Sequence, residues 1–278
     1  MTALTFSLIL LLTSLAAGLL GALSGLGGGV VIVPILTVIF HVDIHYAIGA
    51  SLVSVIATSS GAAAAYVREG FSNIRIGMFL EIATTLGALF GAWLTTRVPT
   101  HSIGFIFGLV LLYSAYASLK QHRETLTQKP DPLAMRLRLK GSFPSGSGVQ
   151  QDYVAQRVPL GFGLMTVAGT LSGLLGIGSG AVKVIAMDQA MRLPFKVSTT
   201  TSNFMIGVTA AASAGLYLRA GYLAPALVMP VMLGVLLGSL LGSRLLIKAQ
   251  VRTIKIVFAL VIVALGVEMI VSSLRGTL

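Results

Sequence analysis

The chain alternates between long apolar stretches and short polar breaks. Eight of the stretches approach the length of about 20 residues that a helix needs to cross a bilayer, because the hydrocarbon core is roughly 30 Å thick. Backbone polar groups inside a bilayer must be satisfied within the protein, so these stretches predict an all-α, polytopic membrane protein. The predicted spans are residues 4–23, 46–66, 76–97, 102–119, 158–176, 197–218, 223–247 and 253–274.

Two further apolar stretches are too short to cross comfortably. They cover residues 29–40 and 180–191, and each directly follows a glycine cluster. We therefore predict a short helix at each place, separated by glycine from the span before it. The clusters are Gly27, Gly28 and Gly29 in the first case and Gly176, Gly178 and Gly180 in the second.

The chain contains an internal repeat. Residues 18–91 align without a gap on residues 169–242, an offset of 151 positions (169 − 18). Small and polar residues that match in one register indicate a duplication, since hydrophobicity alone does not produce them. We predict two repeats of five segments, residues 1–119 and 158–278, joined by a linker of residues 120–157. The matches include Gly18/Gly169, Gly25/Gly176, Gly27/Gly178, Gly29/Gly180, Ser51/Ser202, Thr58/Thr209, Tyr66/Tyr217, Arg68/Arg219, Gly87/Gly238 and Gly91/Gly242.

Basic residues favour an inverted arrangement of the two repeats. Five is an odd number, so the halves have opposite orientations if each short segment crosses the bilayer. Inversion with the linker in the cytoplasm leaves only Arg97, Arg219 and Arg275 outside. Re-entrant short segments would instead place five basic residues of the second half outside, against the enrichment of Lys and Arg in cytoplasmic loops. Those residues are Arg192, Lys196, Lys248, Arg252 and Lys255.

Composition agrees with a membrane protein. Hydrophobic residues make up 55% of the 278 residues and charged residues only 10%, against roughly 25% in soluble domains. The absence of cysteine excludes a disulfide framework and a thiolate metal site. Part of the net charge of +11 lies in residues 120–157, which are interpreted as a flexible cytoplasmic loop able to meet anionic lipid. No motif for nucleic-acid binding accompanies this charge.

The two short segments suggest transport of an anion. Repeats with glycine-interrupted helices at matching positions are typical of secondary transporters. A helix that begins inside the membrane presents unpaired N–H groups, which suit an anion. Lys183 lies three residues after Gly180, where a cation opposes the helix dipole and costs roughly 2.5–3.5 kcal/mol to insert. A bound anion would explain it, and a salt bridge to Asp188 or snorkelling to an interface stays open.

Hydroxyl side chains complete the candidate site. The run Ser198–Asn203 opens a span, and its donors suit the oxygens of an oxyanion, although helix capping and bonding between helices are the alternative interpretation. We predict no catalytic residue, metal site or cofactor. The predicted substrate-binding residues are Gly27, Gly28, Gly29, Ser51, Gly178, Ser179, Gly180, Lys183, Thr200, Thr201, Ser202 and Asn203.

Other polar residues are weaker candidates. Glu81 and Glu268 lie within spans and could bind coupling protons, but a salt bridge to Arg75 is the favoured interpretation of Glu81. For the Tyr-x-Arg pairs at helix ends, aromatic anchoring at the lipid interface is favoured over a gate; these residues are Tyr66, Arg68, Tyr217 and Arg219. For His41, Asp43 and His45, a polar turn is favoured over a metal site.

The glycine motifs resemble those of a known family. Residues 25–34 (GLGGGVVIVP) and 172–180 (SGLLGIGSG) are similar to the paired glycine motifs of the TauE/SafE sulfite exporter family, and residues 47–51 and 198–203 resemble its second motif. The resemblance implies a multi-pass protein of the bacterial cytoplasmic membrane that moves sulfite, sulfonates or related anions. Ser179 departs from the usual middle glycine, and Lys183 stands where many members have an apolar residue.

The leading hypothesis is a secondary transporter of small anions that works by alternating access between its two repeats. Its expected partners are the anion, the lipid bilayer and a coupling proton or sodium ion, while formation of a homo-oligomer is left open. An intramembrane hydrolase using Ser179 is the second hypothesis, and it is disfavoured because all four histidines precede residue 123. A membrane scaffold without cargo is the third, since Gly87-x-x-x-Gly91 permits tight helix packing.

Overall fold

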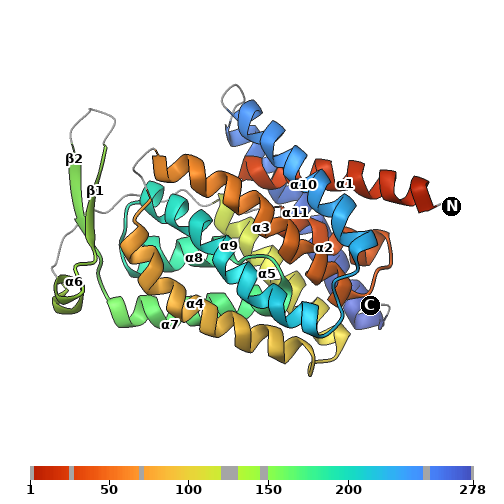
Figure 1. Ribbon diagram of the computed structural model, residues 1–278, viewed down its shortest axis with the longest axis horizontal. Helices are drawn as coiled ribbons and strands as arrows, with labels where there is room; N and C mark the ends of the chain where they lie inside the picture. Colours follow the sequence, from red (N-terminus) through yellow and green to blue (C-terminus); the bar gives the residue numbers. More distant parts are fainter. Residues whose placement is uncertain are drawn as a thin grey trace.

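The computed structural model describes residues 3–24, 28–68, 72–119, 131–144, 150–246 and 251–276. Within these residues eight helices have 18 residues or more, and they coincide with the eight predicted spans (Figure 1). Six of them are long and apolar enough to cross a membrane, which confirms the all-α, polytopic prediction. The long helices are α1 (Ala3–Ser24), α3 (Ile44–Arg68), α4 (Ile74–Thr95), α5 (Thr100–Leu119), α7 (Val158–Leu175), α9 (Phe195–Arg219), α10 (Pro225–Leu246) and α11 (Val251–Arg275).

Helix α9 is not among these six, because it contains the polar run Ser198–Asn203. Within α3 the stretch Ile44–Ser60 is apolar. The two helices pack against each other, and α3 also packs on α10 and α9 on α4. Many hydroxyl side chains of α9 are therefore buried against protein instead of facing lipid.

The two short apolar stretches form interrupted helices. Helix α2 (Gly29–Pro34) continues into a π-helical turn η1 (Ile35–Ile39), and α8 (Gly180–Ile185) continues into η2 (Ala186–Ala190). These bounds confirm the short helices predicted at residues 29–40 and 180–191. Pro34 cannot be the cause of the π turn, because Ile185 occupies the equivalent position in the second half and the turn recurs there.

Equivalent helices of the two halves occupy equivalent environments. The bounds of α2, η1, α3 and α4 recur 151 positions later in α8, η2, α9 and α10 (180 − 29, 195 − 44). Helix α1 of the first half packs on α10 of the second, and α7 of the second half packs on α4 of the first. Both of these close helix pairs therefore form between the two halves. Helices α5 and α11 pack antiparallel, since His101 accepts a hydrogen bond from Ser273 whereas Leu111 lies beside Gly266. The inverted orientation of the repeats stays a prediction.

Glycine allows α4 and α7 to approach each other very closely. The helices run parallel, with Gly87 against Thr166 and Gly91 against Thr170 (Figure 1). On α7, a Cβ atom added at Gly173 would lie 2.0 Å from the carbonyl oxygen of Ala88 on α4, which is much shorter than a van der Waals contact distance. This arrangement confirms the tight packing predicted from Gly87-x-x-x-Gly91.

The linker is more structured than the sequence predicts. Helix α6 (Pro132–Arg136) precedes an antiparallel hairpin of β1 (Lys140–Pro144) and β2 (Gln150–Val154), which stands at one end of the helical body (Figure 1). The composition of residues 141–148 indicates a flexible loop, but Phe143 and Tyr153 bury their rings against the start of α4, and burial of these rings stabilises the hairpin. Residues 120–130 and 145–149 lie outside the described part of the chain.

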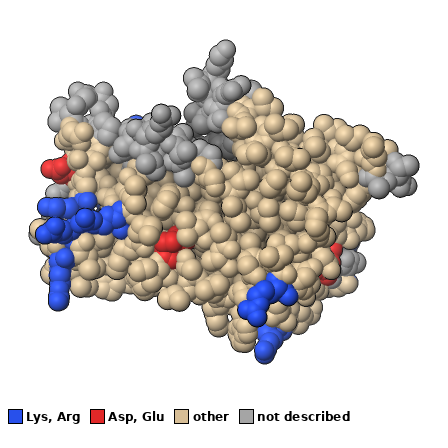
Figure 2. Space-filling model, in the orientation of Figure 1, with Lys and Arg blue, Asp and Glu red and all other residues tan. Residues whose placement is uncertain are grey.

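Charge is sparse over the helical body. On the face shown in Figure 2, Lys and Arg side chains gather in two groups, one of them over the end that carries α6 and the hairpin. Most of the visible surface between them is uncharged. Exposed Leu, Ile, Val, Phe and Met side chains occur along the long helices, as expected where the surrounding solvent is lipid.

Candidate functional site

The two helix breaks meet inside the protein. Ser51 on α3 donates a hydrogen bond of 2.7 Å to the carbonyl oxygen of Gly176, the residue that ends α7. A Cβ atom at Gly29, the first residue of α2, would lie 3.2 Å from the same oxygen and 2.6 Å from Ser51 Oγ. Two of the predicted site residues, Gly29 and Ser51, are therefore brought to the second-half break. Gly27 lies outside the described residues.

The second-half break is a left-handed turn. Gly176, Gly178 and Ser179 have φ angles of +68°, +69° and +43°, and such angles are costly for a residue with a Cβ atom such as Ser179. Ser179 Oγ donates a 2.6 Å hydrogen bond to Ala168 O of α7, so the turn is tied to the preceding helix. The carbonyl oxygen of Gly180 accepts a 3.3 Å hydrogen bond from Ser202.

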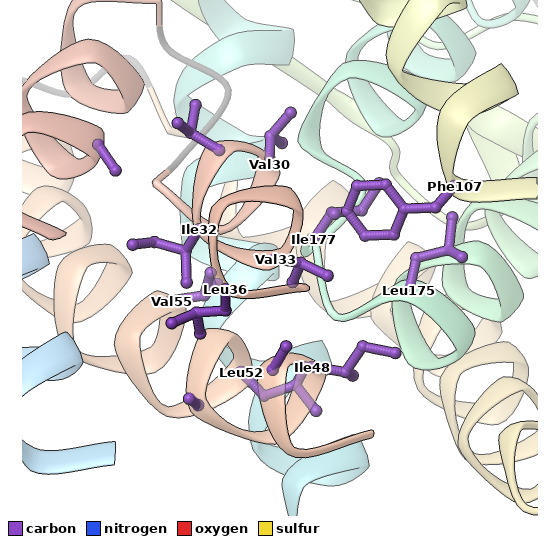
Figure 3. Packing of buried hydrophobic residues seen from close by; sticks show 14 of the residues in the cluster. Val30, Ile32, Val33, Leu36, Ile48, Leu52, Val55, Phe107, Leu175 and Ile177 are labelled. Carbon is purple, nitrogen blue, oxygen red and sulfur yellow. The ribbon is translucent and has the colours of Figure 1, made fainter. Parts of the chain in front are cut away.

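The first-half break lies in an apolar setting. Every residue of α2 is buried. Figure 3 shows Val30, Ile32 and Val33 of α2 among apolar side chains, which include Leu52 and Val55 of α3 and Leu175 and Ile177 of the second-half break. The polar side chains found at the meeting point therefore come from α3 and from the second half, not from α2. The labelled residues in this cluster are Val30, Ile32, Val33, Leu36, Ile48, Leu52, Val55, Phe107, Leu175 and Ile177.

Lys183 forms the most polar part of the interior. Its side chain is 0% exposed, and its Nζ donates a 2.6 Å hydrogen bond to Thr209 Oγ1 on α9. The Thr209 hydroxyl lies 2.6 Å from Glu81 Oε1 on α4, and Glu81 is 5% exposed. Glu81 Oε1 also accepts a 3.2 Å hydrogen bond from Thr85. Three helices thus place a lysine and a glutamate on opposite sides of one threonine.

This arrangement corrects two interpretations of the sequence. Glu81 bonds to Thr85 and Thr209, while Arg75 is exposed, so the proposed Arg75–Glu81 salt bridge is wrong. The side chain of Lys183 bonds to Thr209, not to Asp188, and it is buried instead of snorkelling. Sequence reasoning missed Thr209, although its match with Thr58 in the repeat marked the position.

Most of the predicted hydroxyls are bonded to backbone. Thr200 Oγ1 donates to Lys196 O at 2.9 Å within α9. Thr201 Oγ1 accepts from the backbone N–H of Asn73 at 3.1 Å, which holds the start of α4 against α9. Asn203 is half-buried. Gly28 packs against Val235 of α10. The Thr201 contact fits the alternative interpretation of bonding between helices. Ser51, Ser179 and Ser202 are the hydroxyl residues that bond at or beside the second-half turn.

A second polar cluster connects helix ends. His45 lies 2.9 Å from Asp43 and stacks on Tyr222 with ring centroids 4.8 Å apart. The Tyr217 hydroxyl lies 3.0 Å from both Thr95 Oγ1 and Gly173 O, and it can donate its one proton to either. Tyr217 is 2% exposed, so its interpretation as a lipid-facing anchor is wrong. Among the described residues no group of three or more His, Asp or Glu side chains is placed to hold a metal ion.

We expect Ser51→Ala to lower the free energy of unfolding by about 1–3 kcal/mol, because the buried Gly176 carbonyl would lose its hydroxyl donor. Ser60→Ala is the matched control on the same helix, since Ser60 is exposed and donates its hydrogen bond to Ile56 O one turn away. Thermal unfolding of both variants in detergent measures the difference. Equal midpoints for the two variants would contradict a role for Ser51 in joining the breaks.

The fold and site define a polytopic helical membrane protein whose two interrupted helices meet beside a buried cation, as in membrane transporters. The chain belongs to the TauE/SafE sulfite exporter family: the family model described as "Sulfite exporter TauE/SafE" matches residues 10–269. This match confirms the resemblance seen in the glycine motifs.

Curated relatives carry transporter names. The chain is 27% identical to "Probable membrane transporter protein YunE" of Bacillus subtilis, over 94% of this chain and 96% of the relative. It is 28% identical to "Probable membrane transporter protein YdhB" of the same organism, over 82% and 85%. A probable membrane transporter protein of Methanocaldococcus jannaschii is 25% identical over 77% and 74%. No solved structure matches. The protein is a membrane transporter.

Proposed function

We propose that this protein is a secondary transporter of small anions, with sulfite, organosulfonates or related sulfur oxyanions as cargo, in the bacterial cytoplasmic membrane. The observation that carries the proposal is the complete burial of Lys183 beside the turn that begins α8. A cation is costly at this depth, and an anionic cargo supplies the charge that would make it useful. The family description, which names sulfite, supports the choice of cargo.

Alternating access is supported by the way the halves interlock. Helices α1 and α10 pair as α7 and α4 do, and α5 packs antiparallel to its equivalent α11. Equivalent helices in antiparallel contact are expected of an inverted repeat, in which one half can rock against the other around a central site. The residue equivalent to Lys183 is Ile32, so the site has its cation on one side only.

A hydrolase is the less favoured function. Ser179 Oγ donates its proton to the carbonyl oxygen of Ala168, and a carbonyl cannot act as the base that a serine nucleophile needs. The relatives are named transporters, which also fits a protein without catalytic activity.

Flux measurements test the proposal directly. Purified protein in liposomes should move at least one labelled anion from a panel of sulfite, sulfate, thiosulfate, methanesulfonate and isethionate. Uptake should saturate with concentration and exceed that of empty liposomes at least tenfold. Labelled choline is the control for leak, since a cation should not enter. Absence of saturable uptake for every anion would contradict the proposed function.

A further inference from the structure

We propose that Glu81 carries a coupling proton and that Thr209 links its protonation to anion binding at Lys183. This inference rests on the proposed function and adds the identity of the coupling ion. It predicts that proton and anion bind together and cross the membrane in the same direction. The observation behind it is the buried chain Glu81–Thr209–Lys183, in which both contacts to the Thr209 hydroxyl measure 2.6 Å.

Glu81 has a position where a proton can bind. Its Oε1 is occupied by the hydroxyls of Thr85 and Thr209, whereas its buried Oε2 has no hydrogen-bond partner among the described residues. A buried carboxylate oxygen without a donor is unfavourable. Protonation at Oε2 removes that penalty and leaves Oε1 as an acceptor for the same hydroxyls.

The Thr209 hydroxyl has two possible acceptors, and the protonation state of Glu81 decides which of them it prefers. A hydroxyl has one proton to donate. It can donate to Glu81 Oε1 at 2.6 Å or to the carbonyl oxygen of Met205 at 2.9 Å. When Glu81 is ionised, the charge-assisted bond to Oε1 is the stronger one. When Glu81 is neutral, that advantage disappears and the hydroxyl can turn to Met205.

The protonation state of Glu81 decides which group compensates the positive charge of Lys183. The ionised carboxylate offsets the lysine charge through Thr209, so the interior is electrically balanced without cargo. A protonated Glu81 leaves the lysine charge unbalanced in a buried site, which then favours an anion. Because coupling free energies are reciprocal, a bound anion must in turn favour protonation of Glu81.

Within the part of the chain that the structure describes, the other charged residues on the helices around Glu81 are exposed, half-buried or many positions away. On α4, Arg75 is exposed, and α7 has no charged residue between Val158 and Leu175. The charged residues of α9, Lys196 and Arg219, lie 13 and 10 positions from Thr209. Asp188 on η2 is half-buried. Lys183 is thus the cation connected to Glu81 by hydrogen bonds.

The test follows protons and label together in liposomes that contain a pH-sensitive dye. The cargo is a strong-acid anion of the panel, such as methanesulfonate or sulfate, whose own charge does not change between pH 5 and pH 8. In the wild type, inward anion flux should acidify the lumen, and apparent KM should fall by about 5- to 150-fold between high and low pH. An imposed inward proton gradient should drive accumulation above equilibrium.

Variants separate coupling from transport. Glu81→Gln should lose luminal acidification and gradient-driven accumulation, and its residual exchange of label should no longer depend on pH. Thr209→Val should weaken the pH dependence of KM, and Thr209→Ser should restore it. Glu268→Gln is the matched control, because Glu268 also lies within a long helix but is exposed and accepts a hydrogen bond from Ser272. It should keep full coupling.

The outcomes are distinct. Anion flux without proton movement in the wild type, or acidification that survives Glu81→Gln, would overturn this inference while the transport function stands. Failure of every anion in the panel to move would overturn the proposed function, and this inference with it. Elution of the variants from a sizing column as single peaks verifies that a loss of coupling does not come from unfolding.

Discussion

Lys183→Met should strongly impair anion transport and also destabilise the protein, and a second substitution should separate the two effects. Removing one member of a buried charge pair costs about 3–5 kcal/mol, because the other charge stays behind without compensation. Lys183 is fully buried, and Glu81 is connected to it through Thr209. Lys183→Met alone should therefore lower the unfolding midpoint strongly in detergent.

Adding Glu81→Gln to Lys183→Met should recover most of the stability, since no buried charge remains in the pair. Transport should not recover, because a hydrogen bond between the lysine and a charged cargo is worth about 1.5–3 kcal/mol, which corresponds to roughly a 10- to 150-fold loss of apparent affinity. Unfolding midpoints and flux are measured on the same preparations. Recovery of flux in the double variant would limit Lys183 to a structural role.

The second large effect is expected at the α4–α7 contact. Gly173→Ala should lower the free energy of unfolding by about 3 kcal/mol, the upper part of the range for overpacking, because the new Cβ would lie 2.0 Å from Ala88 O. The helix backbones must separate to admit it. The loss of this contact should also disturb Tyr217, whose hydroxyl lies 3.0 Å from the carbonyl oxygen of Gly173.

Gly163→Ala is the matched control on the same helix. Nothing lies within 4 Å of a Cβ atom at Gly163, so the substitution should be neutral or stabilise α7 by up to about 1 kcal/mol through helix propensity. Thermal unfolding of the two variants in one detergent compares them. A Gly173→Ala protein as stable as Gly163→Ala would refute the close approach of the two helices.

Much of the fold could be predicted because helix formation and membrane insertion depend on local sequence. The long and short helices follow from apolar length and glycine position, and the match of α3 with α9 follows from the 151-residue offset. The hairpin could not be predicted from residues 141–148, because its stability depends on Phe143 and Tyr153 packing against a helix far away in the chain.

The candidate site could be predicted only in part. Lys183 was identified correctly as an unusual buried charge, and Ser51 as a residue near the glycine turns. The hydroxyls of Thr200 and Thr201 were assigned to the cargo, but the structure gives them backbone partners. Glu81 was linked to the wrong partner, because Arg75 is near in sequence whereas Thr209 is near only in space.

The sequence by itself determined the class of protein, the number and length of its long helices and the two glycine interruptions. These properties depend on residues that are neighbours along the chain. Only the tertiary structure decided which side chains form hydrogen bonds with the buried lysine and compensate its charge. Thr209 is 26 positions from Lys183 and 128 positions from Glu81, and the three meet because α4 of the first half packs against α9 of the second. No local pattern specifies that contact, since it depends on how the two halves interlock.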